Sequence, residues 1–139
     1  KIRINMEINF EKLKLGIEYE RTFLADLWGY KGHQAISRGV VTPTGTSKII
    51  LFVTKEKQSS SIQYNDYIKG NTLFWEGEDK HGSDNRIINS GKEKDEIHLF
   101  YREIHHTPFV YYGEIFLKEY KSNSNQPSKF SFSIEYGSH

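Results

Sequence analysis

The strongest constraint on the fold is a strict alternation near the end of the chain, in the segment KFSFSIEY (Lys129 to Tyr136). From Phe130 onward every second residue is aromatic or aliphatic, and serine or glutamate fills the positions between. Successive side chains of a β-strand point to opposite faces, so this period of two predicts a strand with one buried and one exposed face. Such half-buried strands are typical of antiparallel sheets.

Earlier segments also have the composition of strands, because they are rich in β-branched and aromatic residues and are bounded by turn signals. They span residues 35–41, 48–54, 72–78, 96–104 and 108–120. The first two are separated by the turn sequence TPTG. Gly113, inside an aromatic segment, predicts a β-bulge or a corner.

One helix precedes these strands. Phe23 and Leu27 are four residues apart, as are Leu24 and Trp28, which places them on one face of a helix over about 17–27. Gly29 is a natural end for this helix. We therefore expect an α+β domain: a strongly bent antiparallel sheet or a small β-barrel, with an N-terminal helix packed on it.

The length of 139 residues predicts a single domain, which we place at residues 1–136. The last three residues, Gly137-Ser138-His139, have the composition of a cloning linker and tag remnant. Because the chain starts at Lys1 and not at methionine, we expect it to be a piece of a larger protein.

Composition excludes several functional classes. The formal net charge of +1 gives no overall basic field, although a local patch could still bind nucleic acid. The absence of cysteine excludes disulfides and thiolate–zinc sites and is typical of the reducing cytoplasm, where we expect the protein. The sequence contains no run of eighteen apolar residues, so it predicts no membrane-spanning helix.

Motifs for catalysis and for nucleotide binding are missing from the sequence. It contains no Gly-x-Ser-x-Gly elbow, no His-Glu-x-x-His, no phosphate-binding loop and no Gly-x-Gly-x-x-Gly. We therefore expect a binding domain without catalytic residues, bound metal or cofactor. The alternative is a small metal-dependent hydrolase that uses His81, Asp84 and His98.

Binding residues concentrate after Trp75, because seven of the eleven residues in 76–86 are charged or histidine. Flat rings to stack on, groups that read a base edge and cations for phosphates are what a protein needs to hold a base outside its helix. The candidates for stacking are Trp28, Tyr30, Tyr64 and Trp75. The candidates for reading the base edge are Asp66, His81 and Asp84. The candidates for holding phosphates are Arg38, Lys55, Lys57 and Arg86.

Each of these residues also has a plain structural interpretation. Tryptophans are more often core residues than stacking platforms, and Asp84 could simply pair with Arg86. Lys55 and Lys57 could belong to a solvated turn. An arginine inside an apolar strand, as we expect for Arg38, must reach either solvent or an anion.

The succession LWGY, AISRGVVTP, IILFVTKEKQ, QYNDY, LFWEGE, HGSDNRI, IHLFYRE and PFVYYGEIFL covers most of the chain. It resembles a domain of unknown function in bacterial restriction proteins. That domain lies at the C-terminus of helicases with a phospholipase-D-like nuclease, or beside HNH nucleases. In the motifs of that domain, Tyr64 and Asp66 match the Y-D-Y element, Trp75 and Glu76 the W-E element, and Arg102 and Glu103 the R-E element.

The resemblance implies an SRA-like or PUA-like fold that flips a modified base into an aromatic pocket. It also implies that the chain is the DNA-reading module of a modification-dependent restriction endonuclease. Its partners would be modified double-stranded DNA and a separate nuclease domain, possibly with a helicase domain. The expected base is 5-methylcytosine or a related one. The alternatives are a reader of RNA or single-stranded nucleic acid, and a reader of phosphorothioate DNA.

Overall fold

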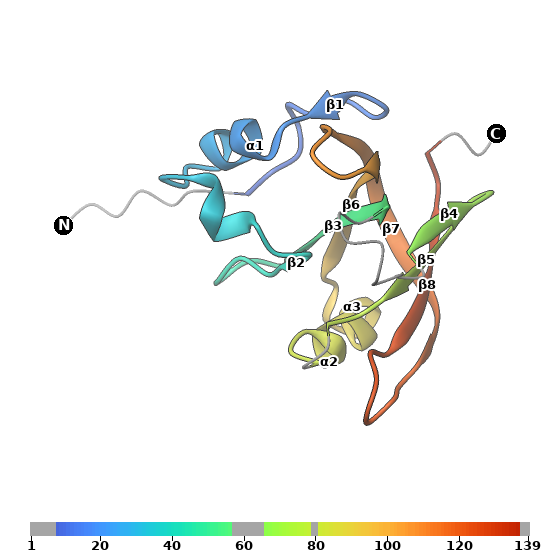
Figure 1. Cartoon of the computed structure of the whole chain (residues 1–139). Coiled ribbons are helices and arrows are strands. Elements are labelled where there is room, and N and C mark those ends of the chain that lie inside the picture. The colour runs from blue at the N-terminus through green and yellow to red at the C-terminus, as the bar shows by residue number, and fades with distance from the viewer. Residues whose placement is uncertain (1–7, 57–65, 79–80, 137–139) are drawn as a thin grey trace.

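The central feature of the protein is one eight-stranded sheet (Figure 1). It is seen in a computed structural model that describes residues 8–56, 66–78 and 81–136. The strands are β1 (Glu18–Tyr19), β2 (Val40–Val41), β3 (Lys48–Glu56), β4 (Tyr67–Lys69), β5 (Thr72–Glu76), β6 (Glu96–Ile104), β7 (Phe109–Lys121) and β8 (Lys129–Ile134). The helices are α1 (Arg21–Leu27), the 3-10 helix η1 (His33–Ile36), α2 (Asp84–Ile88) and α3 (Ser90–Glu93).

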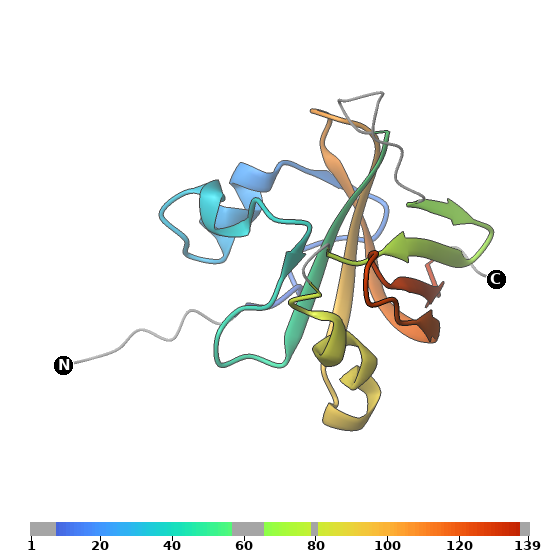
Figure 2. The same cartoon turned by 60° about the horizontal axis from the view of Figure 1, so that its bottom comes forward.

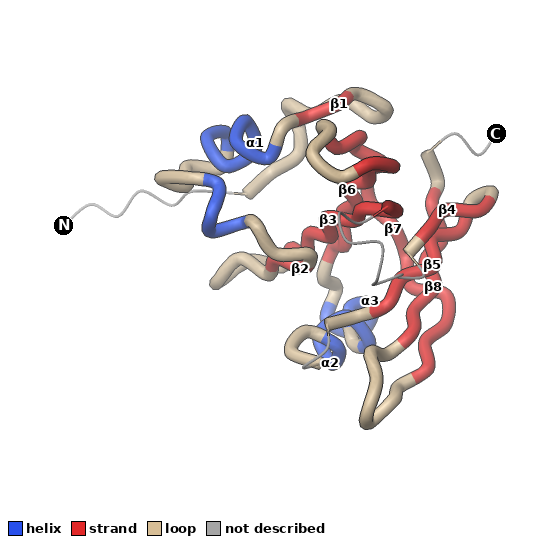
Figure 3. The backbone as a smooth tube through the Cα atoms, in the orientation of Figure 1, coloured by secondary structure: helices blue, strands red, loops and turns tan. Residues whose placement is uncertain are grey.

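The sheet is bent and does not close into a barrel. Its strand order is β2-β3-β6-β7-β8-β5-β4, with β1 added on β7, and within the described residues no pairing joins β2 to β4 (Figures 2 and 3). The expected bent sheet with an N-terminal helix is therefore confirmed. Its strands are mixed, however: β3 pairs with β6 in parallel, because the chain between them leaves the centre of the sheet and forms β4 and β5 elsewhere.

The bend creates two separate cores. The inner core lies between β3-β6-β7 and β8-β5, and it contains Leu99, Trp75 and Phe132 among its buried side chains. The outer core lies between the other face of β3-β6-β7 and the N-terminal segment with α1, and it contains Trp28 and Phe100. Both faces of β6 are buried in its middle, from Ile97 to Tyr101. This explains why the residues there are apolar or aromatic apart from His98.

The bulge predicted at Gly113 is confirmed. Leu99 pairs with Gly113, but Phe100 pairs with Tyr111, so Tyr112 is an extra residue in β7. In a regular strand, residues four apart face the same side. The bulge breaks this rule, because Tyr111 lies in the outer core and Ile115 in the inner core. Gly113 makes the turn possible with a φ of +83°.

Gly113→Ala is expected to lower the free energy of unfolding by about 1–3 kcal/mol, because a side chain is strained at this φ. Its Cβ would also lie 2.7 Å from Leu15 Cδ2, which must move. Urea unfolding measures the change. The matched control is Gly91→Ala in α3, where a Cβ meets nothing within 4 Å and φ is ordinary; here stability should be unchanged or slightly higher. Equal stability of Gly113→Ala and the wild type would contradict this account of the bulge.

One predicted strand is wrong. Residues 35–41 form the end of η1, a bend and the two-residue strand β2. The reason is local: the backbone N–H and hydroxyl of Ser37 both donate to the carbonyl of Gln34, which closes a turn in place of a strand. Arg38 therefore stands exposed at a bend and not inside a strand.

The other segments agree with their predictions, and β6 has the predicted bounds. The N-terminal helix is shorter than expected, because Glu18 and Tyr19 pair with β7 before α1 begins. Gly29 ends the helical region with a φ of +80°. Among the described residues no helix has the length and apolarity needed to span a membrane.

Candidate nucleic-acid interface

The candidate site begins where β5 ends. Trp75 pairs with Phe130 of β8, and the backbone N–H of Gly77 donates to the Ser128 carbonyl at 2.8 Å, which extends the pairing past the strand. Gly77 has no room for a side chain: an added Cβ would lie 2.9 Å from Asp84 Oδ1 and 3.1 Å from a Phe130 ring carbon. The chain after Trp75 is therefore pressed against the carboxylate of Asp84.

Asp84 and His81 form the inner part of the site. Asp84 is the first residue of α2 and is only 7% exposed. Its Oδ2 lies 2.8 Å from His81 Nδ1, and the Ser128 hydroxyl lies 3.4 Å from the same nitrogen. His81 takes a left-handed backbone conformation, with φ +57°, that turns its ring toward Asp84. The other oxygen, Asp84 Oδ1, is buried and has no hydrogen-bond partner among the described residues.

Arg38 and Glu78 form the outer part. Arg38 Nη2 donates to Glu78 Oε2 at 3.0 Å, with the arginine side chain 69% exposed and the glutamate 22% exposed. Like Asp84 Oδ1, Glu78 Oε1 is buried and has no hydrogen-bond partner in the part of the chain that the structure describes. We call Arg38, Glu78, His81, Asp84 and Ser128 the polar cluster. It combines two buried acceptors with one exposed cation.

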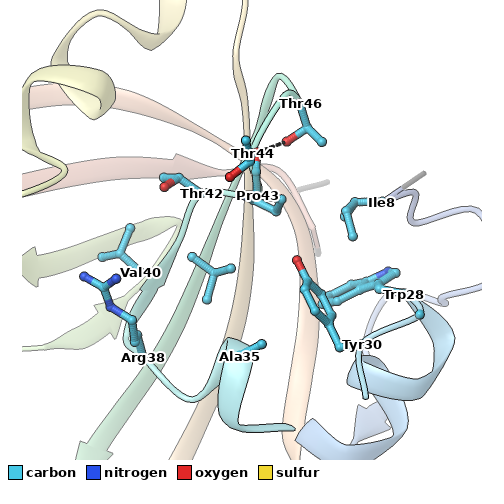
Figure 4. A pocket seen from close by; sticks show the side chains of 12 residues that line it. Ile8, Trp28, Tyr30, Ala35, Arg38, Val40, Thr42, Pro43, Thr44 and Thr46 are labelled. Carbon is cyan, nitrogen blue, oxygen red and sulfur yellow. Dashed lines mark hydrogen bonds between the residues drawn. The ribbon is translucent and has the colours of Figure 1, made fainter. Parts of the chain in front are cut away.

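A cavity of about 430 Å³ meets the polar cluster at Arg38 (Figure 4). Its size lies within the range of small-molecule pockets, about 300–1,000 Å³. Tyr30 stands across the cavity from Arg38, and Thr42, Pro43 and Thr44 line its upper side in Figure 4. Burial raises the pKa of the Tyr30 phenol, so that it remains a neutral donor and acceptor at physiological pH.

A second cavity, of about 280 Å³, is lined by residues of β4, β5 and β8. Tyr67, Phe74, Trp75 and Phe130 are among its lining residues, and the rings of Tyr67 and Phe74 stack at 5.0 Å. Asp66 lies at the start of β4 and is 4% exposed; its Oδ1 accepts the backbone N–H of Glu76 at 2.9 Å. Asp66 therefore holds the end of β5 in place.

The stacking roles expected of the two tryptophans need correction. Trp28 is 2% exposed; its ring meets Phe10 and Phe100 edge-on, and its Nε1 donates to the Asn9 carbonyl. Trp75 is 5% exposed and packs against Phe130 and Phe132. Both rings are core residues that reach a cavity only as part of its wall: Trp28 packs in the outer core at the end of α1, and Trp75 packs in the inner core.

The phosphate contacts expected of the cations are placed differently by the structure. Arg86 donates to the Thr46 carbonyl at 2.8 Å and pairs with Asp95, so it ties α2 to the start of β3 and does not pair with Asp84. Lys55 is exposed at the end of β3 and forms a long ion pair, 3.6 Å, with Glu103. Lys57 and Tyr64 lie outside the described residues.

The three ligands of the metal-dependent alternative, His81, Asp84 and His98, do not lie together. His98 faces the outer core, where its ring stacks on Phe10 and its nitrogens bond to the Tyr111 hydroxyl and to Glu96. Burial lowers the pKa of His98 despite the nearby Glu96 carboxylate. His81 and Asp84 lie in the polar cluster, and nowhere in the described part of the chain do three or more potential ligands gather.

Sequence reasoning missed two members of the polar cluster, Glu78 and Ser128. Glu78 lies within the charged stretch that drew attention, but its pairing with Arg38 spans forty residues. Ser128 joins through the register of β5 and β8, which places its carbonyl opposite Gly77. No local pattern encodes that register, so Ser128 has no signal in the sequence. For Glu78 the signal is its position beside Gly77, opposite Glu76.

Gly77→Ala is expected to displace the Asp84 carboxylate or the Phe130 ring, because the new Cβ overlaps both. Overpacking of this kind costs about 1–3 kcal/mol, and thermal unfolding measures it. The matched control is Gly39→Ala, whose Cβ would meet only the Phe52 carbonyl at an ordinary 3.8 Å. If both variants unfold at the same temperature, the close approach of Gly77 to Asp84 is not real.

The family model described as "Domain of unknown function (DUF3427)" matches residues 13–135. No curated protein matches the chain.

Solved structures with the same fold include SRA domains. The SRA domain of SUVH5 in complex with hemi-methylated CG DNA has a TM-score of 0.60 at 18% identity and covers 97% of this chain and 96% of its own. The same domain with methylated CHH DNA has a TM-score of 0.57 at 16% identity, with the same coverage. The DNA modification-dependent restriction endonuclease AspBHI has a TM-score of 0.54 at 16% identity, over 86% of this chain and 72% of its own. The fold is therefore SRA-like.

Proposed function

The chain belongs to the DUF3427 family, and on that premise we propose that it is the DNA-recognition module of a modification-dependent restriction endonuclease. It reads a modified base, 5-methylcytosine or a close relative, that is flipped out of the duplex and held at the polar cluster. Cleavage belongs to a separate nuclease domain, and the parent protein supplies it, with or without a helicase.

One observation carries the proposal: within the described residues Glu78 Oε1 and Asp84 Oδ1 are buried acceptors without a hydrogen-bond partner, and they lie in one cluster with an exposed arginine that lines a cavity. A buried polar group left unsatisfied costs about 1–3 kcal/mol. A ligand that donates hydrogen bonds removes this cost. The exocyclic amino group of cytosine is such a donor, and carboxylates are its usual readers.

The remaining roles follow from position and charge. Arg38 is exposed at the mouth of the cavity and is free to exchange Glu78 for a backbone phosphate. Tyr30 offers the ring on which a base stacks. His81 holds Asp84 in position through their 2.8 Å contact. A methyl group buried in an apolar notch adds only about 0.8 kcal/mol, so discrimination also depends on how closely the cavity fits the base.

The fold neighbours support the same reading. The SUVH5 structures hold methylated DNA, and AspBHI is a modification-dependent restriction enzyme. Their similarity to this chain lies in the SRA-like fold, and in the SUVH5 structures the domain with this fold is the one that binds DNA.

The test is a gel-shift panel with one short duplex that carries cytosine, 5-methylcytosine, 5-hydroxymethylcytosine, N6-methyladenine or a phosphorothioate linkage. We expect the tightest binding with a 5-substituted cytosine. Equal affinity for all five duplexes would refute base reading. Preference for phosphorothioate, or for a single RNA or DNA strand run beside the panel, would assign the site to a different ligand.

A further inference from the structure

Two arginines flank one aromatic ring on the outer face of the sheet. Arg21, the first residue of α1, places its guanidinium carbon 5.0 Å from the centroid of the Phe109 ring and 4.5 Å from that of Phe52. Arg102 of β6 places its guanidinium carbon 4.1 Å from the Phe109 centroid. Two like charges thus converge on the ring of Phe109.

The charge of this pair is not balanced locally. Among the described residues neither arginine forms an ion pair with a carboxylate; Glu20 acts on Arg102 only at longer range. Burial, and secondarily the charge of Arg102, lowers the pKa of Arg21 to about 10. Cation–π contacts offset part of the cost of holding the two charges together, but they do not neutralise them.

Many guanidinium donors remain unused. Arg102 Nε donates to the Thr54 hydroxyl at 2.8 Å, and its Nη1 donates to the Thr107 carbonyl at 3.0 Å. Arg21 donates weakly from Nη2 to the Arg38 carbonyl at 3.4 Å, and its buried Nε has no partner among the residues that the structure describes. A guanidinium has five N–H donors, so toward the described residues the two groups use three of ten. Oriented but unsaturated guanidinium groups suit the oxygens of a phosphate.

The location of the pair connects it to the polar cluster. The weak bond of Arg21 goes to the backbone of Arg38, whose own side chain pairs with Glu78. Arg38 of the polar cluster, Arg21 and Arg102 therefore follow one another on this surface.

We propose that Arg21 and Arg102 form an anion site that holds one backbone phosphate of the nucleic acid whose base is read at the polar cluster. The inference rests on the proposed function for the identity of the polymer. The phosphate belongs to a nucleotide away from the flipped base, so this site adds affinity but no sequence or modification preference.

The test uses the full chain, a modified duplex and its unmodified counterpart, with dissociation constants measured at several salt concentrations. Arg102→Gln and Arg21→Gln should each weaken binding to both duplexes by the same factor, about tenfold. They should also reduce the slope of log K against log[salt] by about 1. Arg102→Lys retains the charge and should keep the slope while losing part of the affinity.

The matched control is Lys121→Gln, which removes one exposed positive charge at the far end of β7, roughly 40 Å along the strand from Phe109. It should leave the affinity and the salt slope unchanged. Thermal unfolding verifies the fold of each variant, and if Arg21→Gln unfolds, the less buried Arg102 decides the test.

If Arg102→Gln folds and keeps the wild-type affinity and the wild-type salt slope, the anion site is refuted, whether or not the protein prefers the modified duplex. If the wild type binds both duplexes equally, and the salt slope is still smaller for Arg102→Gln, the anion site stands and base reading is refuted. A wild type that binds neither duplex would overturn both proposals.

Discussion

Asp84→Asn is expected to weaken binding of the modified duplex by about 10- to 100-fold, the range for losing a charged contact to a base edge. Binding of the unmodified duplex should stay the same or become slightly tighter. The reason is electrostatic: Asp84 is a carboxylate near a surface that meets phosphates, so removing its charge favours nonspecific binding. A selective loss therefore identifies Asp84 as a contact to the base. Titration of both duplexes by fluorescence anisotropy measures the two effects.

Asp26→Asn is the matched control, because it removes the same charge from an exposed position in α1. It should change neither affinity by more than about twofold, as expected for a screened surface charge. If Asp84→Asn leaves the affinity for the modified duplex unchanged, or strengthens it, Asp84 does not read the base.

Trp75→Ala is expected to lower the free energy of unfolding by about 3–5 kcal/mol, the usual cost of deleting a large buried aromatic ring. Trp75 is 5% exposed and packs on Phe130 and Phe132 in the inner core, where the strand register leaves nothing to fill the space. Chemical denaturation, followed by circular dichroism, measures the change.

Phe74→Ala serves as the control for this variant. Phe74 directly precedes Trp75 in β5, points to the opposite face and is only half-buried against Tyr67, so its removal should cost clearly less. A Trp75→Ala protein that keeps its stability but no longer binds DNA would restore the stacking role first expected of Trp75.

Local patterns predicted most of the strands. β6 and β8 are visible in sequence because composition and alternation act within a few residues, and Gly113 is visible because few other residues accept its backbone angles. The parallel pairing of β3 with β6 is not visible, because it depends on where the intervening chain goes.

Predicting the site was harder for the same reason. The charged stretch after Trp75 did mark a real cluster, in which His81 and Asp84 meet. Arg38 also belongs to this cluster, but it lies at a bend closed by Ser37 and not inside the predicted strand. Arg86 has the right charge, but it is engaged by Thr46 and Asp95. Residue type suggests chemistry, whereas only the fold decides which partners are in reach.

Base extrusion is the central claim, and a mispair tests it most directly. The dissociation constant is measured for a duplex with 5-methylcytosine opposite guanine and for the same duplex with 5-methylcytosine opposite adenine. Flipping a paired base costs a few kcal/mol and a mispaired base less, so the mispaired duplex should bind more tightly, by about tenfold or more. Equal or weaker binding of the mispaired duplex would show that the base is read without leaving the helix.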